Sequence, residues 1–158
     1  MIFLKNYFLN TTAVVDILPI ISEVRYAIRD SDAKSGVVNI IIPGSGAGLC
    51  ILEPVPEVMD GLKNALELFA GEGAEAIDKK KEKVLIAPRV RSAMLGRTLS
   101  IPLNDGRLLI DPYEEIFLFD LDKKSKRREF YVQVISEAAA EEEGQPGQQR
   151  GRAPQKRR

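Results

Sequence analysis

Residues 92–137 read SAMLGRTLSIPLNDGRLLIDPYEEIFLFDLDKKSKRREFYVQVISE and contain apolar runs separated by polar turns. A short run of small residues comes first and stops at Gly96, a residue type that commonly ends helices. Asn104-Asp105-Gly106 tolerates positive φ angles, and so it can reverse an antiparallel pair of strands. The stretch therefore predicts a short helix near residues 89–95 and a meander of strands at 98–103, 107–110, 115–121 and 128–135.

The first half of the chain predicts more strands and two longer helices. Strand-like apolar runs occupy residues 2–9, 37–42 and 49–52. After Asp16, apolar residues recur at helical spacing, which predicts a helix capped by Asp16 with Pro19 in its first turn. Pro56 opens a second amphipathic helix that runs to Gly71. Strands at both ends with two main helices favour an α+β fold, a sandwich of mainly antiparallel strands.

Two segments look solvated. Residues 71–83 show no periodicity and include three consecutive lysines, which predicts a loop. Residues 138–158 lack any large apolar side chain and predict a disordered charged tail. We therefore expect one domain over residues 1–137 and no second domain in a chain of 158 residues.

Composition limits the possible partners and locations. Lys and Arg number 23 and are balanced by 23 Asp and Glu, so no overall charge draws the protein to nucleic acid or membrane. No apolar run approaches the roughly 20 residues of a membrane helix, and we expect a cytoplasmic protein. The single cysteine excludes an intrachain disulfide. Abundant Glu, Lys and Arg beside few Asn, Gln and Cys is compatible with a thermophilic source.

The chain contains no histidine, and this absence restricts its chemistry. Imidazole is the side chain that exchanges protons near neutral pH and the commonest nitrogen ligand of zinc-like metals. With one cysteine, only oxygen ligands remain, and these suit Mg²⁺ or Ca²⁺. We expect no cofactor and no transition metal.

A glycine-rich segment offers a candidate anion site. Gly44, Ser45 and Gly46 follow a strand-like run and resemble a phosphate-binding loop, although an apparent strand follows where such a loop needs a helix. Arg89 and Arg91 are two residues apart; in a turn they could converge on phosphate, whereas on a helix they would not share a face. A hairpin connection without a ligand and two solvated arginines remain the alternatives.

Carboxylates form a second candidate group. Glu53 and Glu114, with Asp111 and Glu115, could pair for general acid–base work or hold a hard cation. Their spacing leaves open whether they share a site. Glu53 and Glu114 are the candidate catalytic residues.

The order of these sequence motifs resembles that of the YjbQ family, whose members are described as secondary thiamine-phosphate synthases. The resemblance covers residues 1–137 and is strongest over the last 45 of them. The family's His-Thr-Thr motif corresponds to Pro43-Gly44-Ser45, its Asn-Glu-Asn motif to Leu52-Glu53-Pro54, and its Gly-Thr-Trp-Gln to Asp111-Pro112-Tyr113-Glu114. Family histidines before the Met-Leu-Gly element correspond to Ala87 and Arg89. The resemblance implies a YjbQ-like sandwich that assembles as a homotrimer.

Three functional hypotheses follow. The first is a divergent YjbQ-like homotrimer without catalysis that binds a phosphate-like small anion or acts structurally. The second keeps weak thiamine-phosphate synthase activity at a rebuilt site of Glu53, Arg89, Arg91 and Glu114. The third is a nucleic-acid-associated module acting through the basic tail, which can contact phosphates but has no aromatic residues for stacking.

Overall fold

The computed structural model describes residues 1–12, 15–71 and 73–137. In chain order the elements are β1 Ile2–Asn10, β2 Asp16–Pro19, α1 Ile21–Ser31, β3 Gly36–Ile41, β4 Ala47–Leu52, α2 Pro56–Phe69, β5 Glu75–Ile77, β6 Lys83–Leu85, α3 Ile86–Leu95, β7 Thr98–Asn104, β8 Arg107–Leu108, β9 Glu115–Asp120 and β10 Arg127–Ser136. The predicted tail at 138–158 lies outside the described residues.

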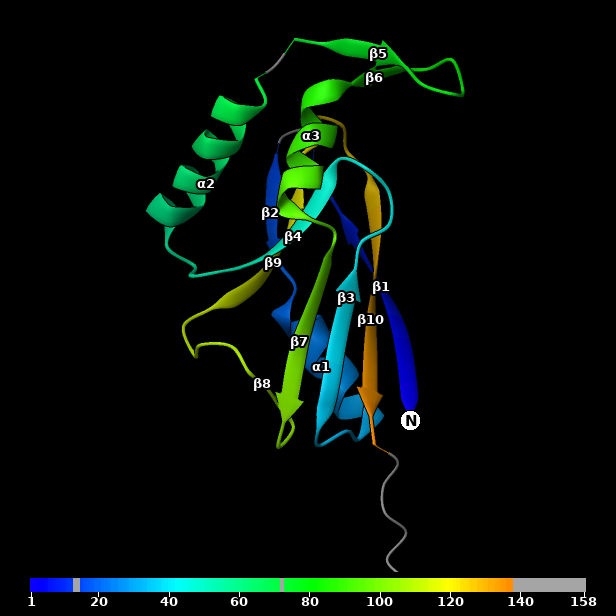
Figure 1. Ribbon diagram of the computed structural model, residues 1–158, viewed down its shortest axis with the longest axis vertical. Coiled ribbons are helices and arrows are strands. Elements are labelled where there is room, and N and C mark those ends of the chain that lie inside the picture. Colours follow the sequence, from blue (N-terminus) through cyan, green and yellow to red (C-terminus); the bar gives the residue numbers. More distant parts are fainter. Residues whose placement is uncertain (13–14, 72, 138–158) are drawn as a thin grey trace, which may run out of the picture.

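The strands form a five-stranded sheet in the order β1-β10-β3-β7-β8 and a three-stranded sheet in the order β2-β9-β4, and their pairings are antiparallel (Figure 1). The two sheets meet where β4 passes the start of β7. There the Leu49 amide donates to the Gly96 carbonyl at 2.9 Å, and the Ile42 amide donates to the Arg97 carbonyl at the same distance. The predicted α+β class with mainly antiparallel strands is confirmed.

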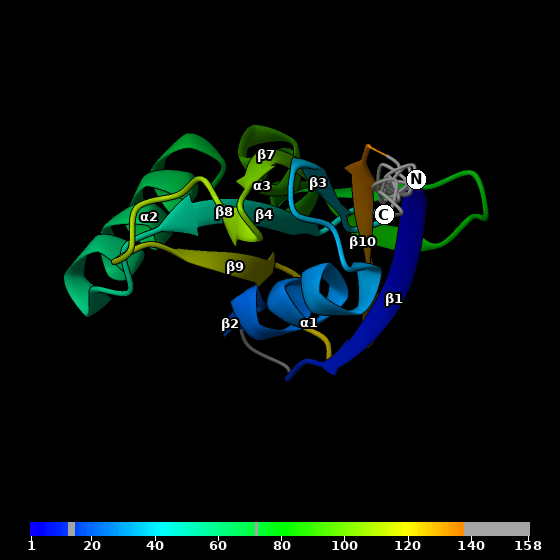
Figure 2. The ribbon, with the colours of Figure 1, turned by 90° about the horizontal axis from the view of Figure 1, so that it is seen from below.

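The main core lies between α1 and the inner face of the larger sheet (Figure 2). Alternate residues of β10 point inward, so Phe130, Val132 and Val134 are fully buried against the apolar side of α1. A smaller apolar cluster joins Leu66 of α2 to Phe117 and Phe119 of β9. The predicted helix from Pro56 and the predicted strands of the second half are present.

The first predicted helix begins later than the sequence pattern indicated. Residues 16–19 form β2, which pairs with β9 so that Ile17 lies opposite Phe119. Asp16 therefore does not cap α1; its carboxylate accepts hydrogen bonds from the amide and hydroxyl of Thr12. Sheet pairing outweighs the local helical spacing here, because β9 offers a complete edge to the segment.

The predicted loop at 71–83 instead contains β5 and leads into β6, which form a two-stranded hairpin. Asp78 closes its turn by accepting from the amides of Lys80 and Glu82 at 2.8 and 2.9 Å. The segment is solvent-exposed as expected, but it carries regular structure. Within the described part of the chain, no helix is long and apolar enough to cross a membrane.

Candidate functional site

The glycine-rich segment forms the connection from β3 to β4. Gly44 and Gly46 have φ angles of +89° and +85°, which favour glycine. A Cβ atom at Gly46 would lie 2.7 Å from Oδ2 of Asp122, whereas one at Gly44 would meet nothing within 4 Å. Gly46 therefore permits a close approach of the loop to the end of β9.

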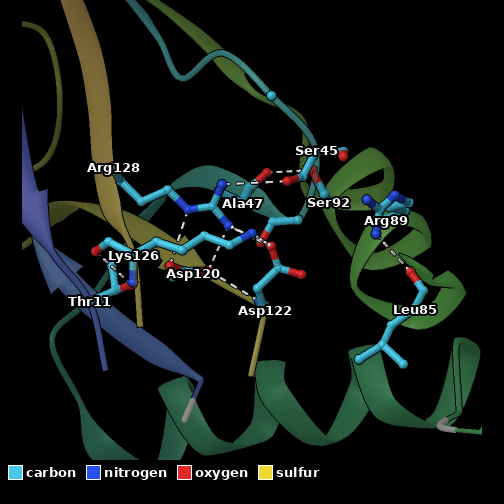
Figure 3. A network of polar contacts seen from close by, with 12 residues as sticks. Thr11, Ser45, Ala47, Leu85, Arg89, Ser92, Asp120, Asp122, Lys126 and Arg128 are labelled. Carbon is cyan, nitrogen blue, oxygen red and sulfur yellow. Dashed lines mark hydrogen bonds and ion pairs between the residues drawn. The ribbon is translucent and has the colours of Figure 1, made fainter. Parts of the chain in front are cut away.

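Side chains from β10, α3 and the connection between α3 and β7 hold the carbonyl groups of this loop. Arg128 on β10 donates from Nη2 to the Gly46 carbonyl at 3.3 Å and from Nη1 to the Ser45 carbonyl at 3.5 Å (Figure 3). Arg97 Nη1 donates to the Gly44 carbonyl at 2.6 Å, and the Ser92 hydroxyl donates to the Ala47 carbonyl. The loop conformation is thus fixed through its oxygen atoms.

A buried ion cluster lies beneath the loop. Arg128 contacts Asp120 through Nε and Nη2 at 3.1 and 2.8 Å, and its Nη2 lies 3.0 Å from Oδ2 of Asp122. Lys126 also pairs with Asp122 (Figure 3). Two cations face two carboxylates, so the cluster is formally neutral and is suited to a structural role.

The electrostatics of Asp120 follow from this arrangement. Burial by itself would raise the pKa of Asp120, but hydrogen bonds from Arg128 and Thr11, with the positive charge of Arg128, outweigh burial and lower the pKa below its usual value. Thr11 also joins the end of β1 to this region, since its amide donates to the Lys126 carbonyl at 2.8 Å. The carboxylate is therefore ionised and committed to internal contacts.

The two candidate arginines of α3 diverge. Arg91 is buried, and its Nε and Nη2 donate to the Ala70 carbonyl at the end of α2, at 3.0 and 2.7 Å. Arg89 is half-buried and donates to the Leu85 carbonyl at 3.0 Å. Residues two apart on a helix face different directions, so α3 does not bring these guanidinium groups together.

Arg89 nevertheless lies on the side of α3 that faces the loop. Ser92, whose hydroxyl bonds the Ala47 carbonyl, follows Arg89 by three residues and therefore shares its helix face. In the view of Figure 3, Arg128 approaches Ser45 from one side and Arg89 lies beyond the other. Of the two candidate arginines, Arg89 is the one that is only half-buried, and it lies on the helix face that carries Ser92.

The candidate carboxylates lie elsewhere. Glu53 follows β4 and Glu114 precedes β9, and the pairing of Leu52 with Glu115 puts both at the same end of the smaller sheet. Gly46 lies at the other end of β4, and six residues of strand separate the two ends by about 20 Å. Glu114 Oε2 accepts from the Asp111 amide at 3.0 Å. Within one chain, therefore, these carboxylates do not lie beside the glycine-rich loop.

Among the described residues, the acidic side chains do not form a metal site. No group of three or more His, Cys, Asp or Glu residues is arranged to hold a metal ion in the segments 1–12, 15–71 and 73–137. The acidic pair Asp120 and Asp122 is occupied by Arg128 and Lys126.

Comparison with known proteins identifies the family to which this fold belongs. A family model described as UPF0047 protein YjbQ-like matches residues 5–137. The chain belongs to the YjbQ family. A UPF0047 protein of Methanocaldococcus jannaschii is 29% identical over 125 residues, which cover 78% of this chain and 86% of the relative. Another, from Methanothermobacter thermautotrophicus, is 25% identical over 124 residues, covering 76% and 83%.

Solved structures support the same fold. A YbjQ-like protein of unknown function from Sulfolobus solfataricus P2 superposes with a TM-score of 0.77 at 19% identity, covering 87% of this chain and 99% of that one. A YjbQ/UPF0047 protein from Clostridium acetobutylicum gives a TM-score of 0.73 at 19% identity, covering 83% and 99%. At these identities the likeness establishes the YjbQ fold alone.

The ion cluster of this YjbQ-family chain was missed by reasoning from the sequence. A signal was present in β10, where Arg128 occupies the same alternating face as the apolar Phe130 and Val132. A cation at an inward position needs a buried partner. Asp120, which ends the apolar run of β9, was the natural candidate.

Proposed function

We propose that this YjbQ-family chain is a homotrimeric small-anion-binding protein that has lost histidine-dependent catalysis. The observation that carries the proposal is the orientation of the glycine-rich loop. Because a trans peptide is planar, its N–H and C=O groups point in opposite directions. The Gly44 and Ser45 carbonyls face Arg97 and Arg128, so the amides of Ser45 and Gly46 point away from these arginines.

Ser45 is exposed, so its amide can meet an anion, whereas Gly46 is buried. Within residues 1–12, 15–71 and 73–137, no hydrogen bond is donated by the backbone amides of Gly44, Ser45 or Gly46. Arg89 supplies a positive charge from the neighbouring face of α3. An exposed amide that donates no internal hydrogen bond, beside a guanidinium group, is a common binding position for phosphate.

The proposed loss of catalysis rests on the residues that surround the loop. No histidine is present, and Arg128 and Lys126 are engaged with Asp120 and Asp122 in a formally neutral ion cluster. A rebuilt thiamine-phosphate synthase site would require Glu53 to meet Arg89. Glu53 and the loop beside Arg89 lie at opposite ends of β4, which disfavours that alternative within one chain.

The proposed homotrimer is supported by an uncovered sheet face. The outward side chains of β1, β3 and β10 form an apolar surface, here called the outer sheet face, in which the exposed fractions are Ile2 69%, Leu4 59%, Phe8 46%, Ile41 44% and Ile135 39%. Ile2 lies opposite Ile135 in the sheet, and Leu4 and Ile41 line one shallow hollow of this face together with Tyr131. Apolar surface of this kind commonly marks a protein interface.

Anion binding is tested by calorimetric titration with inorganic phosphate. We expect Arg89→Ala to weaken phosphate binding about tenfold or more, because it removes a charge-assisted contact. Lys80→Ala, which removes an equal charge from the exposed β5–β6 turn, should leave the affinity unchanged. Equal affinity in the wild type and Arg89→Ala would refute the proposed seat.

Loss of catalysis is tested by a turnover assay for thiamine-phosphate formation. Displacement of pyrophosphate requires stabilisation of negative charge and alignment of two substrates, and we expect little or no product. Robust turnover by the unmodified chain that disappears in Glu53→Gln would instead support the rebuilt carboxylate–arginine site.

A further inference from the structure

A cleft of about 710 Å³ lies between α1 and the segment that follows the β7–β8 turn, and its residue Lys34 precedes β3 whereas the glycine-rich loop follows β3. Its floor is apolar and includes Ile28 of α1 together with Leu108 and Ile110. Both α1 and β8 lie at the same end of the molecule in Figure 1. None of the residues proposed above for the phosphate seat lines this cleft.

Three cations line the cleft without partners of their own. Arg25, Lys34 and Arg107 come from α1, the segment after it and β8. Their side chains make no ion pair or hydrogen bond with the parts of the chain that the structure describes. Arg29, the fourth cation of the cleft, differs because it pairs with Asp30 at 3.1 Å. Unpaired cations converging from three segments favour an anionic ligand.

The backbone fixes two of these cations beside each other. The Gly106 amide donates to the Lys34 carbonyl at 2.8 Å, which attaches the β7–β8 turn to the segment after α1. Arg107 follows Gly106 directly. Asp105 and Gly106 have φ angles of +50° and +71°, as a tight reversal requires. The attachment points of Lys34 and Arg107 are therefore preorganised, which reduces the entropic cost of binding.

Carboxylates form the remaining wall. Asp111 Oδ1 accepts from the Tyr113 amide at 2.9 Å, and Glu114 Oε2 accepts from the Asp111 amide at 3.0 Å. With Asp32, the cleft has three carboxylates against four cations. Asp111 and Glu114 are held by local backbone contacts, and so they do not neutralise Arg25, Lys34 or Arg107 through direct pairs.

We infer that this cleft binds an organic phosphate monoester, with the phosphate at Arg25, Lys34 and Arg107 and the organic body on the apolar floor. A phosphate dianion matches several cations at once, and guanidinium groups bind its oxygens in pairs. The volume of the cleft and its apolar floor can accommodate an organic group in addition to the phosphate. Inorganic phosphate alone would leave Ile28, Leu108 and Ile110 uncovered.

The probe for this site is 1-naphthyl phosphate, followed by its fluorescence, with 1-naphthol and inorganic phosphate as its two halves. We expect the ester to bind the full chain more tightly than either half. Arg107→Gln and Arg25→Gln should each weaken the ester about tenfold, since each loses a charge-assisted contact. Lys80→Gln removes the same charge from the distant hairpin and should leave binding unchanged.

The outcomes separate this inference from the proposed function. Arg25 and Arg107 are exposed, so their variants are expected to fold, which circular dichroism checks. Ester binding that is unchanged in Arg107→Gln and Arg25→Gln, or equal binding of 1-naphthol, would overturn the inference. If Arg89→Ala weakens binding of the ester while the cleft variants do not, the proposed cleft site is refuted and the proposed phosphate site at the glycine-rich loop is supported. If only the cleft variants weaken binding of the ester and Arg89→Ala leaves binding of inorganic phosphate unchanged, the cleft site is supported and the phosphate site at the glycine-rich loop is refuted.

Discussion

Arg128 contacts Asp120 through two hydrogen bonds, Nε to Oδ2 at 3.1 Å and Nη2 to Oδ1 at 2.8 Å, and the Asp120 side chain is fully buried. The same guanidinium group also contacts the Gly46 carbonyl and Asp122. One side chain thus connects the start of β10, the end of β9 and the glycine-rich loop. The geometry of any ligand seat on that loop depends on this connection.

Replacement of Arg128 by methionine is expected to destabilise the protein by about 3–5 kcal/mol, because it leaves Asp120 buried without its cation. Urea denaturation measures the change in the free energy of unfolding. The matched control is Arg127→Met. The guanidinium group of Arg127 is exposed and lies 3.9 Å from the centre of the Phe8 ring. We expect about 1 kcal/mol or less there. Similar losses in both variants would contradict the structural role of the cluster.

Acid should destabilise the fold through Asp120. The folded-state pKa of Asp120 is lowered, so its contribution is present above the unfolded pKa of about 3.9 and is lost as the pH falls through the folded value. The free energy of unfolding should therefore decrease below about pH 4. Asp120→Asn should show a smaller decrease over this range. An unchanged pH profile in Asp120→Asn would show that other carboxylates account for the acid sensitivity.

Gly46→Ala should lower stability more than Gly44→Ala. Both substitutions place a side chain at positive φ, which costs about 1–3 kcal/mol. Only at Gly46 does the new Cβ also meet Asp122, at 2.7 Å. Thermal unfolding of the two variants separates backbone strain from this close contact. Equal melting temperatures would mean that the Asp122 side chain moves away at no cost.

Strands and helices with a strong internal pattern could be predicted from the sequence, whereas features that depend on distant partners could not. The alternation of β1 and the spacing of α2 identify them locally. β2 has four residues, and it is a strand because β9 lies beside it. The site follows the same rule, since the role of Arg91 depends on Ala70, a carbonyl 21 residues away.

Cys50 should react slowly with thiol reagents. Burial raises the pKa of the Cys50 thiol to about 11. Since the thiolate is the reactive form, about one thiol in a thousand would be ionised at about pH 8. Alkylation of the native protein, followed by mass spectrometry, should be far slower than alkylation in denaturant. Equal rates in the two conditions would show that Cys50 is not protected by the fold.

Leu4→Glu is expected to dissociate the proposed homotrimer. Leu4 lies on the outer sheet face and is 59% exposed in the single chain, so a carboxylate there would be buried without a partner on assembly. The dissociation constant should rise by about a hundredfold or more. Ile77→Glu is the matched control, because Ile77 is 64% exposed but lies in β5, which belongs to the separate two-stranded sheet. Light scattering should give a trimer mass for the wild type and Ile77→Glu and a monomer mass for Leu4→Glu. A monomeric wild type would refute the trimer, and a trimer that persists in Leu4→Glu would show that this face is not its interface.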